Sequence, residues 1–444
     1  MRAALIFTLL LGFVDNSTFA QNPNTPVGSP TAGQTAQSGT PLTLQQAEAL
    51  ALRSNPQITI GKLRALQAQQ YVRETRSALL PTAYLSLTGV DAESGSRIAA
   101  GGINNPILFT RAAGGAAVSQ LVTDFRRTTN LVSSAEFQAK AEDKNAAATR
   151  ADVVLAADQA FYNALETLEL VKVAQQAVEA RQTLVDRVQA LANAKLRSDL
   201  DLSFANVDVS RAKLLLLESQ NNYQTALATL SAILGYPDEQ NFQLAEPSGE
   251  MEPPDANAQR LIAQALAQRP EVASLQFQLE AAQKNSRAEH DLWRPTVGAL
   301  GVAGLAPVRD PQIPHWYGAV GVNINIPVFN GFLYNARAKT ADLQAEAARQ
   351  KLLDLKNNVA RDVRISWQET NRAYARLSVT QQLRGQASLA LDLAQQRYNL
   401  GLSSIVEFSQ AELGKTEADI ADTDARYQYR LTQIVLAYTT GTSK

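Results

Sequence analysis

The side chains that most often carry out chemistry in proteins are nearly missing from this sequence. It has no Cys and only two His, His290 and His315, which are far apart. A disulfide, a thiolate nucleophile and a multi-histidine metal site are therefore excluded. No G-x-S-x-G, P-loop or H-E-x-x-H motif is present, and Gly298, Gly301 and Gly304 do not have dinucleotide-binding spacing. We therefore predict that the protein is not an enzyme and that it holds no metal or cofactor.

Length and charge narrow the class of protein further. A chain of 444 residues ordinarily forms two or three globular domains. The 41 Lys and Arg against 42 Asp and Glu leave a net charge of −1. This is not the basic excess that phosphate binding requires, so we expect no nucleic-acid partner. Aromatic residues make up only 6%, which suits long Ala-rich helices better than a large globular core.

The N-terminus has the features of an export signal. Arg2 precedes an apolar stretch at 3–14, and a small-residue cleavage site ends at Ala20. This stretch is too short for a membrane-spanning helix, which needs about 20 apolar residues. We expect residues 1–20 to be a signal peptide. Residues 21–41, rich in Pro, Gly, Ser, Thr, Gln and Asn, are expected to be a flexible leader.

The sequence contains two related halves. A shift of 214 positions aligns the first parts of the halves, and a shift of 206 aligns the later parts. The matches include Pro56 with Pro270, Pro81 with Pro295, Ser198 with Ser404 and Gly235 with Gly441. The halves extend over 42–235 and 257–441, and the Pro-rich segment 236–256 is the linker between them. The length is thus explained by one duplicated unit and not by several different domains.

Long helices are predicted in both halves. Neither Gly nor Pro occurs between Gly115 and Gly235, and apolar residues in 171–192 recur at steps of three, four and seven. In the second half, a helix of about 65 residues before Gly401 would be about 100 Å long at 1.5 Å per residue. Such a helix needs neighbours along its whole length, as in a coiled coil or a long bundle.

Alternating residues predict two strands in each half, at 81–90, 114–122, 295–305 and 318–326. In the last of these, Val320, Val322 and Ile324 share one face, and Gly321 and Asn323 share the other. This pattern is typical of a barrel strand with an apolar outside and a polar lumen. Four strands cannot close a barrel, and lipid does not tolerate open sheet edges, so several copies must contribute. Three copies would supply 12 strands.

Short motifs carry a resemblance to a known family. The first half has Ala-Leu-Arg-Ser-Asn-Pro at 51–56 and Arg-Ser-Ala-Leu-Leu-Pro at 76–81. The second half has Ala-Leu-Ala-Gln-Arg-Pro at 265–270, Leu-Trp-Arg-Pro at 292–295, Ile-Pro-Val-Phe-Asn-Gly at 326–331 and Arg-Tyr-Asn-Leu-Gly-Leu-Ser-Ser-Ile-Val-Glu at 397–407. In order, spacing and duplication, these motifs resemble the TolC-like outer membrane efflux protein family over nearly all of 42–441.

The resemblance implies a mostly α fold with a small β part. It implies a long antiparallel α-helical coiled-coil barrel, with the linker at its equator, and a 12-stranded transmembrane β-barrel shared by a homotrimer. The protein would contact lipid in the outer membrane of a Gram-negative bacterium and have a large periplasmic portion. In this family the channel passively conducts substrates from a periplasmic adaptor and an inner membrane pump, either an efflux pump or an ABC transporter, to the outside. The absence of Cys separates the chain from the family's lipid-anchored branch.

The resemblance also assigns roles to the two turns between long helices. The turns that would contact the adaptor contain Lys195, Leu196 and Arg197 in the first half, and Gly401, Leu402 and Ser403 in the second. Gly401 is able to take the positive φ of a sharp turn. Lys195 at the aligned position argues against the same tight geometry in the first half.

Three residues just after these turns are implied to form a constriction. In a trimer, Asp201 and Glu407 would supply six carboxylates near one narrow point. Gln410 stands where the family has an aspartate, so the ring would be less acidic. The alternative is that Asp201 and Glu407 are acids at helix starts, favoured only by the helix macrodipole.

Three aromatic residues lie next to predicted strands. Trp316 and Tyr317, beside a strand, are expected at the membrane interface, whereas Trp293 fits either a lower aromatic belt or a helix–strand junction.

The predicted function has one leading interpretation and two alternatives. The leading function is the outer membrane duct of a tripartite efflux or secretion system. A type I protein secretion duct remains an alternative, and so does a periplasmic coiled-coil structural or adaptor protein. The sequence does not specify the cargo.

Overall fold

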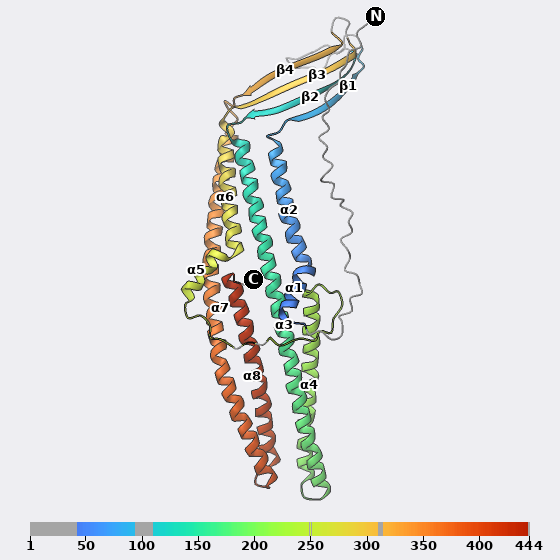
Figure 1. The fold of residues 1–444 in the computed structure, drawn as a ribbon, viewed down its shortest axis with the longest axis vertical. Coiled ribbons are helices and arrows are strands. Elements are labelled where there is room, and N and C mark those ends of the chain that lie inside the picture. The colour runs from blue at the N-terminus through green and yellow to red at the C-terminus, as the bar shows by residue number, and fades with distance from the viewer. Residues whose placement is uncertain (1–41, 94–109, 248, 250, 310–313, 443–444) are drawn as a thin grey trace.

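A computed structural model describes residues 42–93, 110–247, 249, 251–309 and 314–442. The molecule is long and narrow, with helices running along it and a small sheet at one end (Figure 1). The predicted signal peptide at 1–20 and leader at 21–41 lie outside the described residues.

One order of elements occurs twice. The first half contains α1 (Leu44–Ser54), α2 (Pro56–Ser77), β1 (Thr82–Val90), β2 (Arg111–Thr123), α3 (Arg127–Asn193) and α4 (Asp199–Ile233). The second half contains α5 (Ala258–Gln268), α6 (Pro270–His290), a 3-10 turn (Asp291–Trp293), β3 (Thr296–Val308), β4 (Trp316–Asn325), α7 (Leu333–Asn399) and α8 (Ile405–Thr440). Both α3 and α7 have 67 residues, which corresponds to about 100 Å, as the sequence predicts.

The first helical segment of each half is divided into two helices at a proline. Pro56 and Pro270 each occupy the first position of the second helix. A proline is favourable there because its missing N–H is not needed, but the residue before it is forced into an extended conformation. Asn55 and Arg269 accordingly have ψ near +125°, and the Asn55 side chain accepts the N–H of Gln57. The aligned prolines were the signal for this break.

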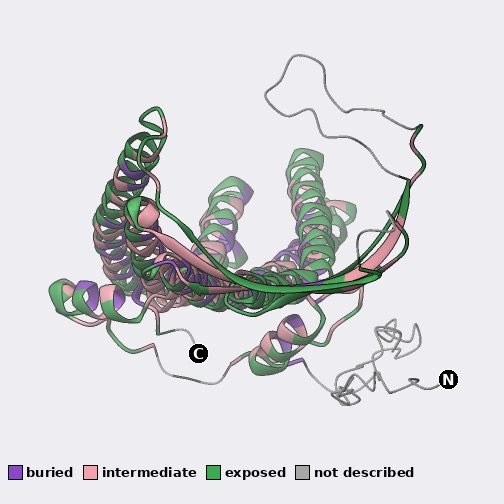
Figure 2. Ribbon diagram, turned by 90° about the horizontal axis from the view of Figure 1, so that it is seen from above, coloured by how far each residue is buried: buried purple, intermediate pink, exposed green. Residues whose placement is uncertain are grey.

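The helices lie along one curved wall that is open on one side (Figure 2). Their contacts are built largely from small residues, and Ala157, Ala164 and Ala174 are at most 1% exposed. Larger side chains concentrate where α1 packs on α3 and α4, with Phe161 and Leu230 fully buried. In the part of the chain that the structure describes, no helix is long and apolar enough to cross a membrane.

The four strands form one antiparallel sheet in the order β1-β2-β3-β4. Among the described residues, β1 and β4 therefore have no partner on their outer edges. The register gives the two faces different character, as the alternation in the sequence predicts. The apolar face carries Leu85, Leu87, Val118, Leu305, Trp316, Val320, Val322 and Ile324. The other face carries mainly polar or small residues, among them Thr82, Ser86, Gly115, Ser119, Gly304, Tyr317, Gly321 and Asn323.

Each β-hairpin passes into its long helix through an unusual bend. Phe125 and Arg126 before α3, and Gly331 and Phe332 before α7, all have positive φ. Three of the four are not glycine, so each of these costs about 1–2 kcal/mol in backbone strain. The matching bends show that the duplication extends to backbone conformation. The residue types do not indicate these bends, because only Gly331 is of a type that favours positive φ.

Candidate channel tip and membrane sheet

The two turns at the far end from the sheet have the same construction. Ser198 caps α4 and Ser404 caps α8, each accepting a backbone N–H from the residue three positions later, Asp201 (3.2 Å) and Glu407 (3.3 Å). Both acids therefore occupy the first helical turn, where the positive end of the helix dipole favours a negative charge. The geometry of one chain is thus compatible with the helix-start interpretation of these acids.

Lys195 adopts the same left-handed conformation as Gly401, with φ of +59° against +74°. In both turns the next residue donates its N–H to a carbonyl five residues earlier: Leu196 to Leu191 and Leu402 to Arg397, each at 2.8 Å. This is the Schellman arrangement that ends many helices. The prediction that Lys195 would prevent a tight turn was therefore wrong. The hydrogen bonds of the helix ending hold Lys195 in the left-handed conformation, although this costs about 1 kcal/mol in backbone strain.

Side chains of the first half hold the second half near the tip. Arg187 donates to the Asn399 side chain at 3.0 Å, and Arg197 donates to the Tyr398 carbonyl at 3.2 Å. The Arg197 guanidinium also lies over the Tyr398 ring, 4.5 Å from its centroid. The Tyr398 ring in turn stacks on the Phe408 ring, with the ring centroids 5.5 Å apart. In this conformation the two helical hairpins are closed against each other.

The predicted constriction and docking residues are mostly open to solvent in the single chain. Leu196 and Leu402 project from the two turns and are 70% and 67% exposed. Glu407 is also exposed, and its carboxylate is 3.4 Å from Arg397 Nε. Gln410 is exposed and Asp201 is half-buried. The structure thus places these groups at one end of the molecule, while a ring of six carboxylates would be a property of an assembly and stays a prediction.

We use the word seam for the surface where α3 and α4 meet α8. Near the tip it is apolar, with Leu184 and Val188 of α3 packed among Ile405 and Phe408. The polar residues buried farther from the tip in the seam were not predicted from the sequence. Arg181 of α3 was the available signal, because it interrupts a run of apolar residues at core spacing.

Three charged residues from three helices meet in the seam. Arg181 is 6% exposed and donates to the Asp208 carbonyl of α4 at 3.3 Å. Glu412 of α8 is 9% exposed, and its Oε2 atom is buried without a hydrogen-bond partner among the described residues. Burial raises the pKa of Glu412 to about 7; Arg181 lowers this pKa and Asp208 raises it further. A carboxyl group in this environment is close to half-protonated near neutral pH.

Farther from the tip, two acids meet across the seam, one from α3 and one from α8. Glu166 of α3 hydrogen-bonds with Asp424 of α8. Burial, followed by the hydrogen bond and the charge of Asp424, raises the pKa of Glu166 to about 8. Arg376 of α7 partly opposes this shift in the pKa, and its guanidinium lies 3.9 Å from Asp424. Two carboxyl groups in contact hold a shared proton more strongly than either would alone.

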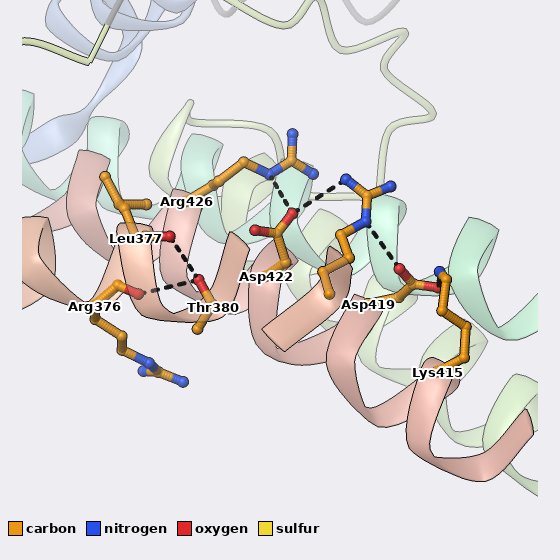
Figure 3. Close-up of polar contacts among 8 residues, drawn as sticks. Arg376, Leu377, Thr380, Lys415, Asp419, Asp422 and Arg426 are labelled. Atoms are coloured by element: carbon orange, nitrogen blue, oxygen red, sulfur yellow. Dashed lines mark hydrogen bonds and ion pairs between the residues drawn. The ribbon is translucent and has the colours of Figure 1, made fainter. Parts of the chain in front are cut away.

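The contacts within the α7–α8 hairpin are of a different kind. Arg384 of α7 bonds both Asp419, at 3.0 Å, and Asp422, at 3.4 Å, on α8. Lys415 also reaches Asp419, and Arg426 lies 3.7 Å from Asp422 (Figure 3). Each acid in this group therefore has two basic partners.

The two aromatic residues predicted at the membrane interface lie on opposite faces of the sheet. Trp316 is 63% exposed on the apolar face, and its place at the interface stays a prediction. Tyr317 lies on the polar face over Gly115 and Gly304, where an added Cβ would come within 2.5 Å of the tyrosine ring or hydroxyl. Neighbouring residues of a strand alternate, so the two side chains do not face the same side of the sheet, and the place of Tyr317 at the membrane interface also stays a prediction. Trp293 donates to Asn335 at 3.3 Å, which places it at a helix–strand junction.

Comparison with known proteins gives concordant results. The sequence profile of a family described as outer membrane efflux protein matches residues 49–236 and 261–442. The outer membrane protein TolC of Salmonella enteritidis is 22% identical over 420 residues, which is 90% of this chain and 83% of TolC. Among solved structures, the Campylobacter jejuni CmeC outer membrane channel has a TM-score of 0.78 at 17% identity, covering 90% of this chain and 87% of CmeC. The outer membrane protein VceC of Vibrio cholerae has a TM-score of 0.76 at 17% identity, covering 90% and 96%.

Proposed function

The chain belongs to the outer membrane efflux protein family, and from this premise we propose that it is the outer membrane duct of a tripartite export system. Three copies would close a 12-stranded barrel in the outer membrane and a helical tunnel in the periplasm. The duct would conduct substrates passively, receiving them from a periplasmic adaptor and an inner membrane pump. Efflux of small molecules is the leading role, with protein secretion as the alternative.

The sheet is the observation that carries this proposal. Its edge strands β1 and β4 are unpaired in the described chain, and its apolar face leaves Leu87 and Val320 both 91% exposed. In water an open edge and an exposed apolar face would both be unfavourable. Pairing β1 with β4 of the next copy removes the edges, and lipid covers the apolar face. The polar face, with Ser86 and Asn323, then lines the lumen.

The helical part supports the same proposal. The curved wall of Figure 2 would become a closed tunnel when three copies are joined. We assign Leu196 and Leu402, with the turns that carry them, to docking on the adaptor, because both are apolar side chains that are largely exposed at the tip. We assign Asp201, Glu407 and Gln410 to the constriction of the closed tip. Opening would then separate the α7–α8 hairpin from α3 and α4 along the seam.

Cross-linking of β1 to β4 between copies tests the proposal. The chain has no Cys, so a pair of introduced cysteines reports on a single contact. Ser86→Cys would be combined in turn with cysteine at Ala319, Gly321 or Asn323, all of the polar face. At least one pair should give a covalent trimer in detergent and no cross-link within a monomer. As a matched control, Ser86→Cys with cysteine at Ala117 of the central strand β2 should give no trimer. A stable monomer in water without detergent would overturn the proposal and favour a periplasmic structural protein.

A further inference from the structure

The seam differs from the inside of the α7–α8 hairpin in how its charges are compensated. Inside the α7–α8 hairpin, Asp419 and Asp422 each meet two bases. In the seam, Glu412 has a buried oxygen without a partner, and Glu166 meets another carboxyl group. A buried carboxylate that lacks compensation is costly, whereas its protonated form is tolerated.

We propose that the seam is a proton-sensitive latch, in which carboxyl groups at two levels hold protons while the seam is closed and release them when it opens. The inference rests on the proposed function, because it concerns the opening of the duct. The latch joins the first half of the chain to α8, and the hairpin α7–α8 is the part that moves as a unit.

The charged groups around Glu412 are few. Arg181 faces it from α3, and Asp208 faces it from α4, where Arg211 lies 3.5 Å from Asp208. On its own helix, Lys415 is already bound to Asp419. From α7, Leu391, Ala394 and Tyr398 pack into the neighbouring apolar cluster of the seam. The exposed Asp392 accepts a bond from Gln396.

The surroundings of Glu166 are equally well defined. Asp424 faces it from α8, and Arg376 approaches Asp424 from α7. On its own helix, Glu169 is bound to Lys172, and Lys172 also acts on Tyr223 of α4. Arg376, the base that opposes the rise in the pKa of Glu166, is therefore shared with Asp424.

The direction of the pH effect follows from the two states of the seam. In the closed seam, the pKa values of Glu412 and Glu166 are raised to about 7 and about 8 from an ordinary value of 4.5. An open seam returns both groups to water, so their pKa values fall toward 4.5. The closed state therefore binds protons more strongly and is fully favoured below pH 4.5. It loses stability as the pH rises from there to about 8, and alkaline conditions free the tip.

The test measures opening of purified trimers in planar lipid bilayers between pH 5 and pH 8. The open probability of the wild-type duct should rise at least about tenfold over this range, since one unit of pKa difference corresponds to a factor of ten. The double variant Glu166→Gln with Glu412→Gln, which imitates the protonated groups, should stay closed and show no such rise. Glu417→Gln, an exposed acid on the same helix, is the matched control and should keep the wild-type profile.

A distance measurement separates the latch from the channel function. Spin labels on cysteines at Leu196 and Leu402, one in each tip turn, should move apart between pH 5 and pH 8 in trimers with one labelled copy. An unchanged distance, or a double variant that titrates like wild type, overturns the latch while leaving a pH-independent channel. Intact trimers that never conduct would instead overturn the proposed function. If the glutamine variant does not form trimers, Glu412→Leu provides the same uncharged state with a packed side chain.

Discussion

The two long interfaces of α8 have opposite designs. Toward α7, its charged residues are held in a network of ion pairs in which Arg384 joins two acids. Toward α3 and α4, it presents an apolar contact near the tip. Above this contact lie Glu412, whose buried oxygen has no partner among the described residues, and Asp424, which meets Glu166. Ion pairs stabilise the first interface, whereas the second is stable only while its carboxyl groups are protonated. A moving part needs both: one interface that preserves its shape and one that releases it.

The largest effect should follow from removing the apolar contact of the seam. Phe408 is 5% exposed and packs with Leu184 and Val188 across the seam. Phe408→Ala should cost about 3 kcal/mol of closing free energy, as for other large buried side chains. The expected outcome is a duct that is mostly open in bilayers and rapidly cut by protease at the tip.

The matched control for this prediction is Val185→Ala. Val185 packs with Ala205 and Val209 of α4, inside the first hairpin. Its loss should reduce thermal stability without raising the open probability. Equal opening by both variants would show that the two kinds of interface do not differ.

A smaller effect is expected from the polar ties at the tip. Arg187→Ala combined with Arg197→Ala removes the bonds to Asn399 and to the Tyr398 carbonyl. Hydrogen bonds from charged donors contribute about 1.5 kcal/mol each at the lower limit, and solvent exposure at the tip reduces this further. Single-channel conductance should rise without any change in the mobility of the trimer on a native gel. Conductance equal to wild type would remove these residues from the closing contact.

The smallest effect on opening should come from the interface inside the α7–α8 hairpin. Arg384→Gln breaks the links to Asp419 and Asp422 and should lower stability by about 1 kcal/mol, because Arg384 is half exposed. Thermal unfolding followed by circular dichroism should show a modest fall in Tm, and the open probability should stay at the wild-type level. A large rise in opening would mean that the hairpin bends internally and does not move as one unit.

Helices and strands could be predicted from the sequence where a single physical rule determines them. The alternation of 318–326 predicted the faces of β4, and the lack of Gly and Pro predicted that the stretch containing α3 and α4 is helical. The turn at Lys195 was not predictable from residue type, since the helix ending overrides the preference of lysine for negative φ. The same alternation places Trp316 and Tyr317 on opposite faces of β4.

The seam was beyond sequence reasoning for another reason. Arg181 and Glu412 are 231 positions apart, and only the packing of α8 on α3 brings them together. A single glutamate on a helix is ordinarily solvated, so nothing in its immediate sequence distinguishes Glu412 from the exposed Glu417. Arg181, at a core position of α3, was the one visible sign that a buried charge needed a partner.

The unpaired strands β1 and β4 have a consequence for biogenesis. A sheet with two free edges and an apolar face has no stable folded state as a separate chain, so folding of this part and assembly are one event. In the proposed trimer, the yield of this folding should depend steeply on the local concentration of chains, because three copies must meet before every edge is paired. Until then the same edges are able to pair with any other extended polypeptide. A newly exported chain would therefore need protection during its passage to the membrane, and a variant that slows assembly would be lost to aggregation or proteolysis before its conductance mattered.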